Sequence, residues 1–510
     1  MRPRFSVLHN ALLLTAANLA MRGVSMIFQV WLADAVGAAG LGLLQLILTV
    51  HGFVITVGTS GIRVAAMYLS AEEYGLRRFH GIRQAMRWCI GGGILLSTAV
   101  GFLLTVFSPY IAQIWVRDPR AAASLRLLGL TLPLTCLSAI LSGYFTACNQ
   151  IKRLVAVEIA DKIATVGITT ALLRTGTQTN VEHACLSIVG GNAIANLGSV
   201  CALLIMMISN FRKIAPAPGD LAMGKRMLNL CIPLALNDYL RSGLATLEQF
   251  LIPHGLSRSG QSQEQALSAY GTIQGMVFPV MMFPSTVLFA VSDLLVPELA
   301  RCRAEKKQER IDHLISTCLR MGILYAGVVA GMLFVLARPL GVLVYDSQEA
   351  GLYLRIFAPM VLMLYMDCIV DGMHKGMGQQ VYCVKVNTLT SLLDVVFLFL
   401  LLPKYGITGY FISFLVTHAI NFYLSIRKLL QLANAAPTLR FLFLAACSVI
   451  AAAAATSRML PENTSWLHIL ICGGFYLAML GFLLIVTGSW QEKDHRWLKH
   501  ALMPKDGTDT

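Results

Sequence analysis

Long apolar segments separated by short polar loops run along almost the whole chain. Each approaches the roughly 20 residues that an α-helix needs to cross a bilayer. The first follows Arg2 and Arg4 but is too long for the apolar region of a signal peptide, so we interpret it as an uncleaved helix. The predicted spans lie at about residues 9–35, 41–69, 85–107, 121–147, 154–175, 183–208, 227–254, 268–297, 314–337, 350–374, 382–402, 407–431, 440–457 and 466–488. The pattern therefore predicts an all-α membrane protein with about fourteen transmembrane helices.

Two of the apolar segments carry polar side chains on one face of the predicted helix. The matching residues are Asn18, Arg22 and Gln29 in the first segment and Asn237, Arg241 and Glu248 in the seventh. Both sets are spaced by four and then seven positions, at a constant offset of 219, and this spacing keeps side chains on one helical face. An arginine near the bilayer centre costs about 2.5–3.5 kcal/mol on insertion scales. We therefore expect both faces to line a cavity or to contact another helix.

A second stretch supports an internal duplication. The sequence SLRLLGLTLPLTCLSAILSGYFTACNQ, residues 124–150, aligns with YLRIFAPMVLMLYMDCIVDGMHKGMGQ at a constant offset of 229, and matches Gly143 with Gly372. A repeat of six helices contains an even number of spans, so both copies have the same orientation in the membrane. They are then related by an axis along the membrane normal. Such lobes are typical of transporters that work by alternating access. The predicted parts are two six-helix lobes at residues 1–210 and 211–436, two extra helices at 437–490 and a cytoplasmic tail at 491–510.

Composition narrows the class and the location. Hydrophobic residues make up 56% and charged residues 13% of the chain, whereas a soluble domain has about 25% charged residues. The net charge of +14 does not indicate nucleic-acid binding, because lysine and arginine concentrate in the N-terminus and the even-numbered loops. This asymmetry predicts that both termini of the multi-pass protein lie in the cytoplasm. We expect the membrane to be the plasma membrane. The twelve cysteines show no spacing typical of metal ligands, so we expect no metal and no cofactor.

Two segments resemble a known family. GLGLLQLILTVHGFVITVGTSGIRVAA, residues 40–66, looks like the second helix of the polysaccharide-transport branch of the multidrug/oligosaccharidyl-lipid/polysaccharide exporter superfamily. AYGTIQGMVFPVMMFPSTVLFAVSDLLVPELARC, residues 269–302, is similar to the eighth helix of the stage V sporulation protein B family. The resemblance implies a flippase for a lipid-linked saccharide of cell-wall, spore peptidoglycan or polysaccharide synthesis, whose synthesis enzymes would be partners. It also implies that arginines of a central cavity hold the lipid diphosphate.

Three arginines are the candidate ligands of that diphosphate: Arg22, Arg241 and Arg63. A guanidinium fork suits pairs of phosphate oxygens. Arg63 stands where the family usually has proline. At 1.5 Å per residue, we expect it to lie about 9 Å from the cytoplasmic end of its helix. Two alternatives stay open. In one, Arg63 snorkels to the interface. In the other, Arg22 and Arg241 are structural, with Arg241 paired to Asp238 or Glu248 and Arg22 paired to a neighbouring helix. The remaining candidates for the cavity are Asn18, Asn237, Gln29 and Glu248.

Other ionisable residues in the predicted spans suggest a coupling ion. An oxygen-rich site made by Asp238, Asn387 and Asp394 would suit sodium, if the seventh and eleventh helices meet; proton coupling is the other expectation. Glu158 and Lys162 have the i,i+4 spacing of an ordinary structural pair.

Three classes of function compete at this point. The resemblance favours a lipid-linked oligosaccharide flippase acting among membrane lipids. A drug/cation antiporter of the same superfamily usually has twelve helices, so the extra pair argues against it. A lipid-dependent glycosyltransferase would need an acidic or metal motif in a sizeable outer loop, and the predicted outer loops are short. We therefore expect a transporter and not an enzyme.

Overall fold

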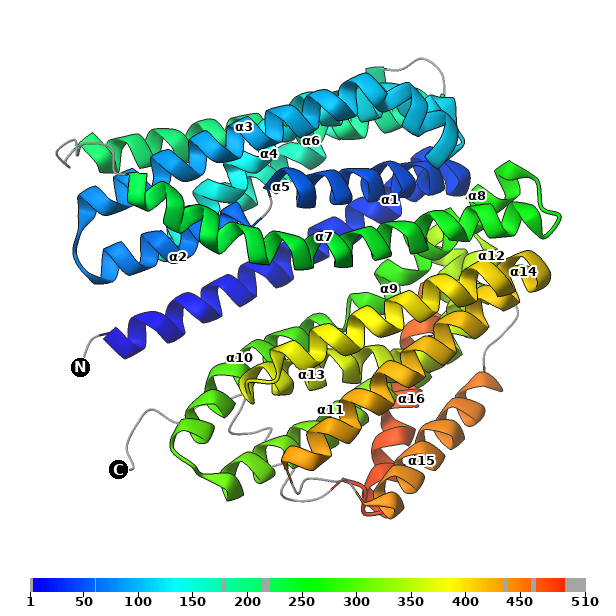
Figure 1. Ribbon diagram of the computed structural model, residues 1–510. Coiled ribbons are helices and arrows are strands. Elements are labelled where there is room, and N and C mark those ends of the chain that lie inside the picture. The colour runs from blue at the N-terminus through cyan, green and yellow to red at the C-terminus, as the bar shows by residue number, and fades with distance from the viewer. Residues whose placement is uncertain are drawn as a thin grey trace. The chain divides into compact units, whose positions relative to one another are not determined.

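The computed structural model describes residues 3–59, 61–175, 180–212, 221–433, 438–459 and 465–490. Side chains are described from Leu19 onward, apart from those of residues 175, 221, 233, 234 and 237. Every regular element in these ranges is a helix (Figure 1), which confirms the predicted all-α class. The predicted tail at 491–510 lies outside the described residues.

Contacts along the chain group the helices into two compact units, Met1–Gly271 (unit 1) and Thr272–Thr510 (unit 2). Unit 1 contains α1 (Pro3–Thr59), α2 (Ile62–Gly75), α3 (Phe79–Ile111), η1 (Ala112–Val116), η2 (Pro119–Ala121), α4 (Ala122–Ala147), α5 (Ile151–Thr175), α6 (Val181–Arg212), α7 (Leu221–Arg258) and α8 (Gln263–Gly271). Unit 2 contains η3 (Thr272–Val277), α9 (Phe278–Met282), α10 (Thr286–Ala304), α11 (Gln308–Tyr345), α12 (Gln348–Phe357), η4 (Ala358–Met360), α13 (Val361–Gly376), α14 (Gln380–Leu432), α15 (Leu439–Ser457) and α16 (Trp466–Val486). The predicted lobes were defined by the sequence repeat, whereas the two units are defined by contacts between residues. The predicted lobe boundary at residue 211 therefore stays a prediction.

The helices account for the predicted spans. In the described ranges, nine helices are long and apolar enough to cross a membrane, and a pair bent by 59° between α8–α9 and α10 makes a tenth. α1 and α14 are interrupted at Gly37 (φ 74°) and Gly406 (φ 56°), so each holds two spans. α5 and α7, of 25 and 38 residues, are also long enough. A helix therefore stands at each predicted span of this multi-pass membrane protein.

The turns of the two repeats have the same backbone conformation. All five non-glycine residues with positive φ in the described ranges fall into pairs at the offset of 229: Arg77 with Lys306, Arg117 with Asp346, and Asn149 with Gly378. Few non-glycine residues adopt positive φ, so their coincidence at one offset supports the duplication found in the sequence.

Packing inside each unit repeats at the same offset. A methyl group built on Gly93 would lie 2.6 Å from Ile140 Cδ1, and one built on Gly322 would lie 2.5 Å from Ile369 Cδ1. Both glycines are thus contact points between the third and fourth helices of their repeat. The duplication therefore extends from the sequence to the close packing of side chains.

The offset changes from 219 to 229 within a short part of unit 1. Gln29 and Gly42 are thirteen residues apart, whereas the equivalent Glu248 and Gly271 are twenty-three apart. The ten extra residues therefore lie between 248 and 271. Gly42 and Gly271 pack where α8 crosses α1, because a methyl group on either would overlap the backbone of the other helix. This close crossing requires glycine on both helices.

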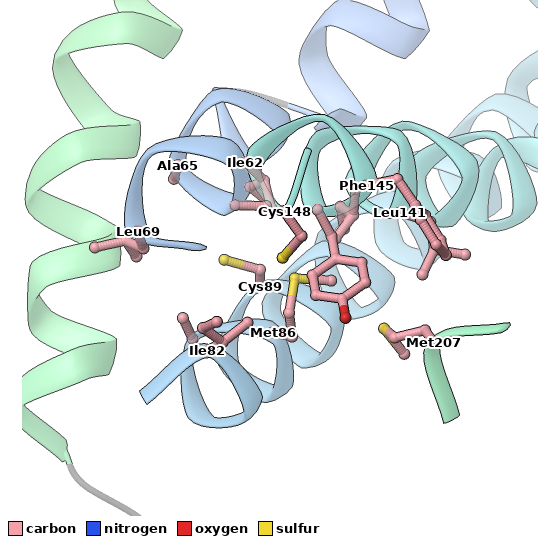
Figure 2. Packing of buried hydrophobic residues seen from close by; sticks show 14 of the residues in the cluster. Ile62, Ala65, Leu69, Ile82, Met86, Cys89, Leu141, Phe145, Cys148 and Met207 are labelled. Carbon is pink, nitrogen blue, oxygen red and sulfur yellow. The ribbon is translucent and has the colours of Figure 1, made fainter. Parts of the chain in front are cut away.

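Each unit has its own buried core. In unit 1, apolar side chains of α2, α3, α4 and α6 pack together (Figure 2). In unit 2, α15 and α16 pack on α11. Arg320 of α11 lies 4.6 Å from the centre of the Phe441 ring and donates to the Ser489 carbonyl at 2.6 Å. The extra C-terminal pair is thus fixed to unit 2 by apolar and polar contacts.

Candidate functional site

The two helices with the arginine-bearing stripes pack against each other within unit 1. The Tyr239 hydroxyl of α7 donates to the Val57 carbonyl of α1 at 3.2 Å. Farther along α7, the Arg226 guanidinium pairs with the Glu72 carboxylate of α2 at 2.7 Å. α7 therefore lies along α1 and α2. Arg241 follows Tyr239 by two residues, so it belongs to the part of α7 that lies beside α1.

The candidate arginines are exposed on the protein surface. Arg22, Arg63 and Arg241 all have exposed side chains, while Gln29 and Glu248 are half-buried. In the described part of α7, Arg241 forms no ion pair with Asp238, which is itself exposed. The structure therefore does not support a structural pair between Arg241 and Asp238. The side chains of Asn18 and Asn237 lie outside the described residues, so their role stays a prediction.

Arg63 lies deeper along its helix than expected. The second span is divided between α1, which ends at Thr59, and α2, which begins at Ile62 after Gly61 with its left-handed φ of 71° and runs to Gly75. Arg63 is therefore about 18 Å from that end at 1.5 Å per residue, about twice the predicted 9 Å. The prediction was wrong because the helix continues beyond residue 69. α4 fixes this position, since Gly143 packs on the Arg63 carbonyl.

A polar pocket of about 240 Å³ lies near Arg22 and Arg63. Its lining includes Met21, the neighbour of Arg22, and Glu158, whose carboxylate interacts electrostatically with Arg63. The lining residues that carry polar groups are Ser138, Ser142, Glu158, Asp161, Lys162, Asn196 and Ser199. α4, α5 and α6 thus bring hydroxyl, acidic, basic and amide groups together in the membrane part of unit 1, beside Met21 of α1.

The side chains that line the pocket make contacts different from the expected pair of Glu158 and Lys162. Glu158 and Lys162 form no ion pair within the described part of α5; instead, the Ser199 hydroxyl donates to Asp161 Oδ1 at 2.7 Å. Sequence reasoning did not include Asn196 and Ser199. Their signal was present, since both are polar and lie three residues apart inside a predicted span. The partner of each group comes from another helix, which the sequence alone could not identify.

Two of the three residues of the candidate cation site lie in unit 2. Asp394 is buried and accepts from the Ser413 hydroxyl at 2.7 Å and the Thr417 hydroxyl at 3.1 Å. Asn387 accepts from the Asn421 amide at 3.2 Å. Asp238 belongs to unit 1, so the complete set stays a prediction. Among the described residues, no three His, Cys, Asp or Glu side chains are grouped for a metal ion.

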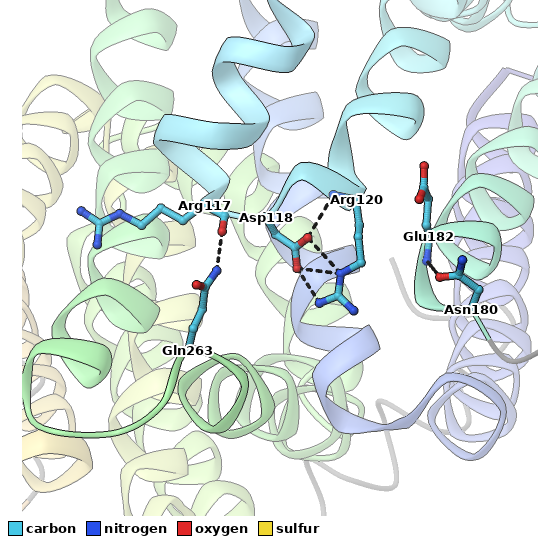
Figure 3. A network of polar contacts seen from close by, with 6 residues as sticks. All are labelled: Arg117, Asp118, Arg120, Asn180, Glu182 and Gln263. Carbon is cyan, nitrogen blue, oxygen red and sulfur yellow. Dashed lines mark hydrogen bonds and ion pairs between the residues drawn. The ribbon is translucent and has the colours of Figure 1, made fainter.

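The end of unit 1 predicted to lie outside is fixed by loop contacts (Figure 3). Asp118 accepts from the backbone N–H of Arg120 at 3.0 Å and pairs with its guanidinium at 2.6 Å. The Gln263 side chain donates to the Arg117 carbonyl, while the Arg117 side chain points away from Asp118 (Figure 3). These contacts join the α3–α4 turn to the start of α8.

Comparisons with known proteins agree with this architecture. A family model described as polysaccharide biosynthesis protein matches residues 7–303, and one described as MatE matches residues 258–400. Stage V sporulation protein B of Bacillus subtilis (strain 168) is 21% identical over 410 residues, 79% of this chain and 79% of that protein. These matches confirm the resemblance seen in the two quoted segments.

Solved structures show the same fold. The lipid II flippase MurJ in an inward closed conformation has a TM-score of 0.72 at 12% identity, covering 93% of this chain and 99% of that one. An inward-facing multidrug resistance MATE family transporter of the MOP superfamily has a TM-score of 0.64 at 12% identity, covering 80% and 94%.

Proposed function

We propose that this chain, a member of the family of polysaccharide biosynthesis proteins, moves a lipid-linked saccharide from the inner to the outer leaflet of the membrane. The family and the fold place it among transporters of the MOP superfamily. One relative by sequence is a sporulation protein and one relative by fold is a lipid II flippase. A cell-wall or spore precursor attached to a lipid diphosphate is the substrate class that agrees with both.

The exposure of Arg22, Arg63 and Arg241 supports this proposal most directly. All three belong to membrane helices of unit 1 and are exposed, although an arginine in lipid is costly. Exposure at that depth is favourable only if the guanidinium groups face a wet cavity. A saccharide diphosphate offers such groups several anionic oxygens for charge-assisted, paired hydrogen bonds.

The neighbouring pocket gives Arg63 a partner when no substrate is bound. Glu158 acts electrostatically on Arg63, so it would serve as a counter-charge in the empty protein. An arriving diphosphate carries more charge than one carboxylate and replaces it at Arg63. The exchange keeps Arg63 compensated throughout transport, which lowers the cost of a charge in the membrane.

The backbone offers hinges for alternating access. Gly37, Gly61 and Gly406 interrupt long helices with positive φ, and the bend of 59° separates α9 from α10. Helix breaks of this kind let packed helices reorient with changes at a few residues. We propose that both termini lie in the cytoplasm and that the catalytic chemistry of synthesis belongs to partner enzymes.

Ion coupling is a further part of the proposal. Asp238, Asn387 and Asp394 would hold sodium, and proton coupling is the alternative. The buried Asp394 with its two hydroxyl donors supplies an oxygen-rich surrounding of the kind that hard cations prefer.

A drug/cation antiporter is the second candidate, because the MatE model matches residues 258–400. The α15–α16 pair argues against it, since the antiporters usually have twelve helices.

The two functions are separated by reconstituting the protein in vesicles with a fluorescent lipid-linked saccharide diphosphate. Movement of this lipid to the outer leaflet, with no movement of organic cations, supports the flippase. Cation exchange without lipid movement would contradict it.

A further inference from the structure

A second, larger cavity of about 760 Å³ opens at one end of unit 1. It lies where α2, α4 and α6 end and where α3 and α5 begin. These helix ends border the second and fourth loops, which the charge pattern predicts on the cytoplasmic side. The cavity shares no lining residue with the pocket beside Arg63. Its volume is within the range typical of sites for small molecules.

The lining of this cavity divides into an apolar and a polar zone. Phe79, Ile82, Ile205 and Met206 form the apolar zone. Ile82 belongs to the packed core of unit 1 (Figure 2), whereas Ile205 on α6 is 68% exposed. The apolar zone therefore extends from the packed core of unit 1 to an exposed side chain of α6.

The polar zone contains a guanidinium whose charge has a neutral partner. Arg153 Nη1 donates to Gln150 Oε1 at 3.0 Å. The Asn210 amide donates to the same oxygen at 3.2 Å and to the Tyr144 hydroxyl at 3.4 Å. A guanidinium carries five N–H donors, so Arg153 retains both donors and charge for an anionic ligand.

The surroundings of the cavity add positive charge. Four exposed cations lie close in the chain to its lining residues: Arg77, Arg78, Lys152 and Arg212. The nearby acids of α2 do not offset them, because Glu72 and Glu73 lie 2.7 and 3.8 Å from the Arg226 guanidinium of α7. This end of unit 1 is therefore basic around a cavity with an apolar side.

We propose that the cavity binds an anionic phospholipid of the cytoplasmic leaflet, with its phosphate on Arg153 and one acyl chain along Ile205 and Met206. Basic pockets between membrane helices on the cytoplasmic side are suited to anionic lipid head groups. A soluble anion would use only the polar zone, whereas a phospholipid covers both. The bound lipid joins the α4–α5 turn to the end of α6.

The proposal is tested on the purified full-length protein by adding phosphatidylglycerol or phosphatidylcholine with identical acyl chains. Bound lipid is counted by native mass spectrometry, and hydrogen exchange is followed over residues 144–153 and 205–212. Phosphatidylglycerol should bind and slow exchange in both segments. Arg153→Gln should weaken this binding about tenfold, as expected for a lost charge-assisted hydrogen bond. Arg87→Gln is the matched control, because Arg87 is exposed on α3 and does not line the cavity.

A second variant and a soluble ligand keep the test decisive. Ile205→Ser changes an exposed side chain and should weaken lipid binding while the protein stays folded. Equal protection by phosphatidylcholine, or unchanged binding by both Arg153→Gln and Ile205→Ser, would overturn the proposal. Inorganic phosphate that gives the same protection without lipid would assign the cavity to a soluble anion and would also overturn it.

Discussion

Replacement of Gly143 by alanine perturbs the contact through which α4 holds the backbone at Arg63. A methyl group on Gly143 would lie 2.9 Å from the Arg63 carbonyl oxygen and 3.4 Å from the Met67 backbone nitrogen. Both neighbours are backbone atoms of α2, so the helix itself must move by a few tenths of an ångström. Overpacking of this kind costs about 1–3 kcal/mol of stability, and the movement displaces a proposed substrate ligand.

Gly91→Ala provides a matched control for this substitution. Gly91 is also helical, on the adjacent α3, and no atom lies within 4 Å of a methyl group built on it. Alanine there should stabilise the helix by about 0.5–1 kcal/mol. In detergent melting, Gly143→Ala should therefore unfold at a lower temperature than the wild type, and Gly91→Ala at the same or a higher one. If Gly143→Ala melts as high as Gly91→Ala, the close contact at Arg63 is not part of the folded protein.

Three further predictions concern unit 2. Asp394→Ala removes the acceptor of two buried hydroxyls and should cost about 1–3 kcal/mol of stability; Asp394→Asn should make transport independent of sodium, and an unchanged sodium response would remove Asp394 from the cation site. Arg320→Met removes the contacts to Phe441 and Ser489 and should increase hydrogen exchange in α15 and α16, whereas unchanged exchange would show that apolar packing alone holds the pair. Contacts with the neighbouring Lys307, and then with Arg301, lower the pKa of Glu305 to about 2. The stabilisation is therefore complete above the ordinary carboxyl pKa of 4.5 and is lost as the pH falls through about 2. The melting difference between wild type and Glu305→Gln should thus stay constant from pH 5 to 8, and a difference that changes over this range would contradict the ion pair.

Hydropathy predicted the helices well because each span must satisfy its own backbone hydrogen bonds in lipid. It also left residues 36–40 between two predicted spans, and φ is positive there at Gly37. It ended the second span too early, because Ser70, Glu72 and Glu73 read as a polar loop. In the structure Ser70 and Glu73 are buried, and α7 supplies Arg226 as the partner of the acids. A partner from a helix so distant in the sequence leaves no local signal.

The candidate site was predictable in its arginines but not in its surroundings. Arg22 and Arg241 were found because a charge in an apolar segment is conspicuous and the repeat shows it twice. The polar pocket near Arg63 depends on the packing of α1, α4, α5 and α6, and a single sequence contains no such distances. The structure shows the repeat more clearly than the sequence does. Arg77 and Lys306 are equivalent positions of different residue type, and both have positive φ.

The central claim is that Arg22 and Arg241 bind the diphosphate of a lipid-linked saccharide. The most direct measurement is lipid flipping in vesicles by the alanine and lysine variants of each arginine, with detergent melting recorded in parallel. Each alanine variant should lose flipping and keep its melting temperature, because removal of an exposed membrane charge does not penalise insertion. Each lysine variant should retain part of the activity, since it keeps the charge but loses the paired hydrogen bonds. Wild-type flipping by both alanine variants, or loss of flipping in proportion to lost stability, would contradict the claim.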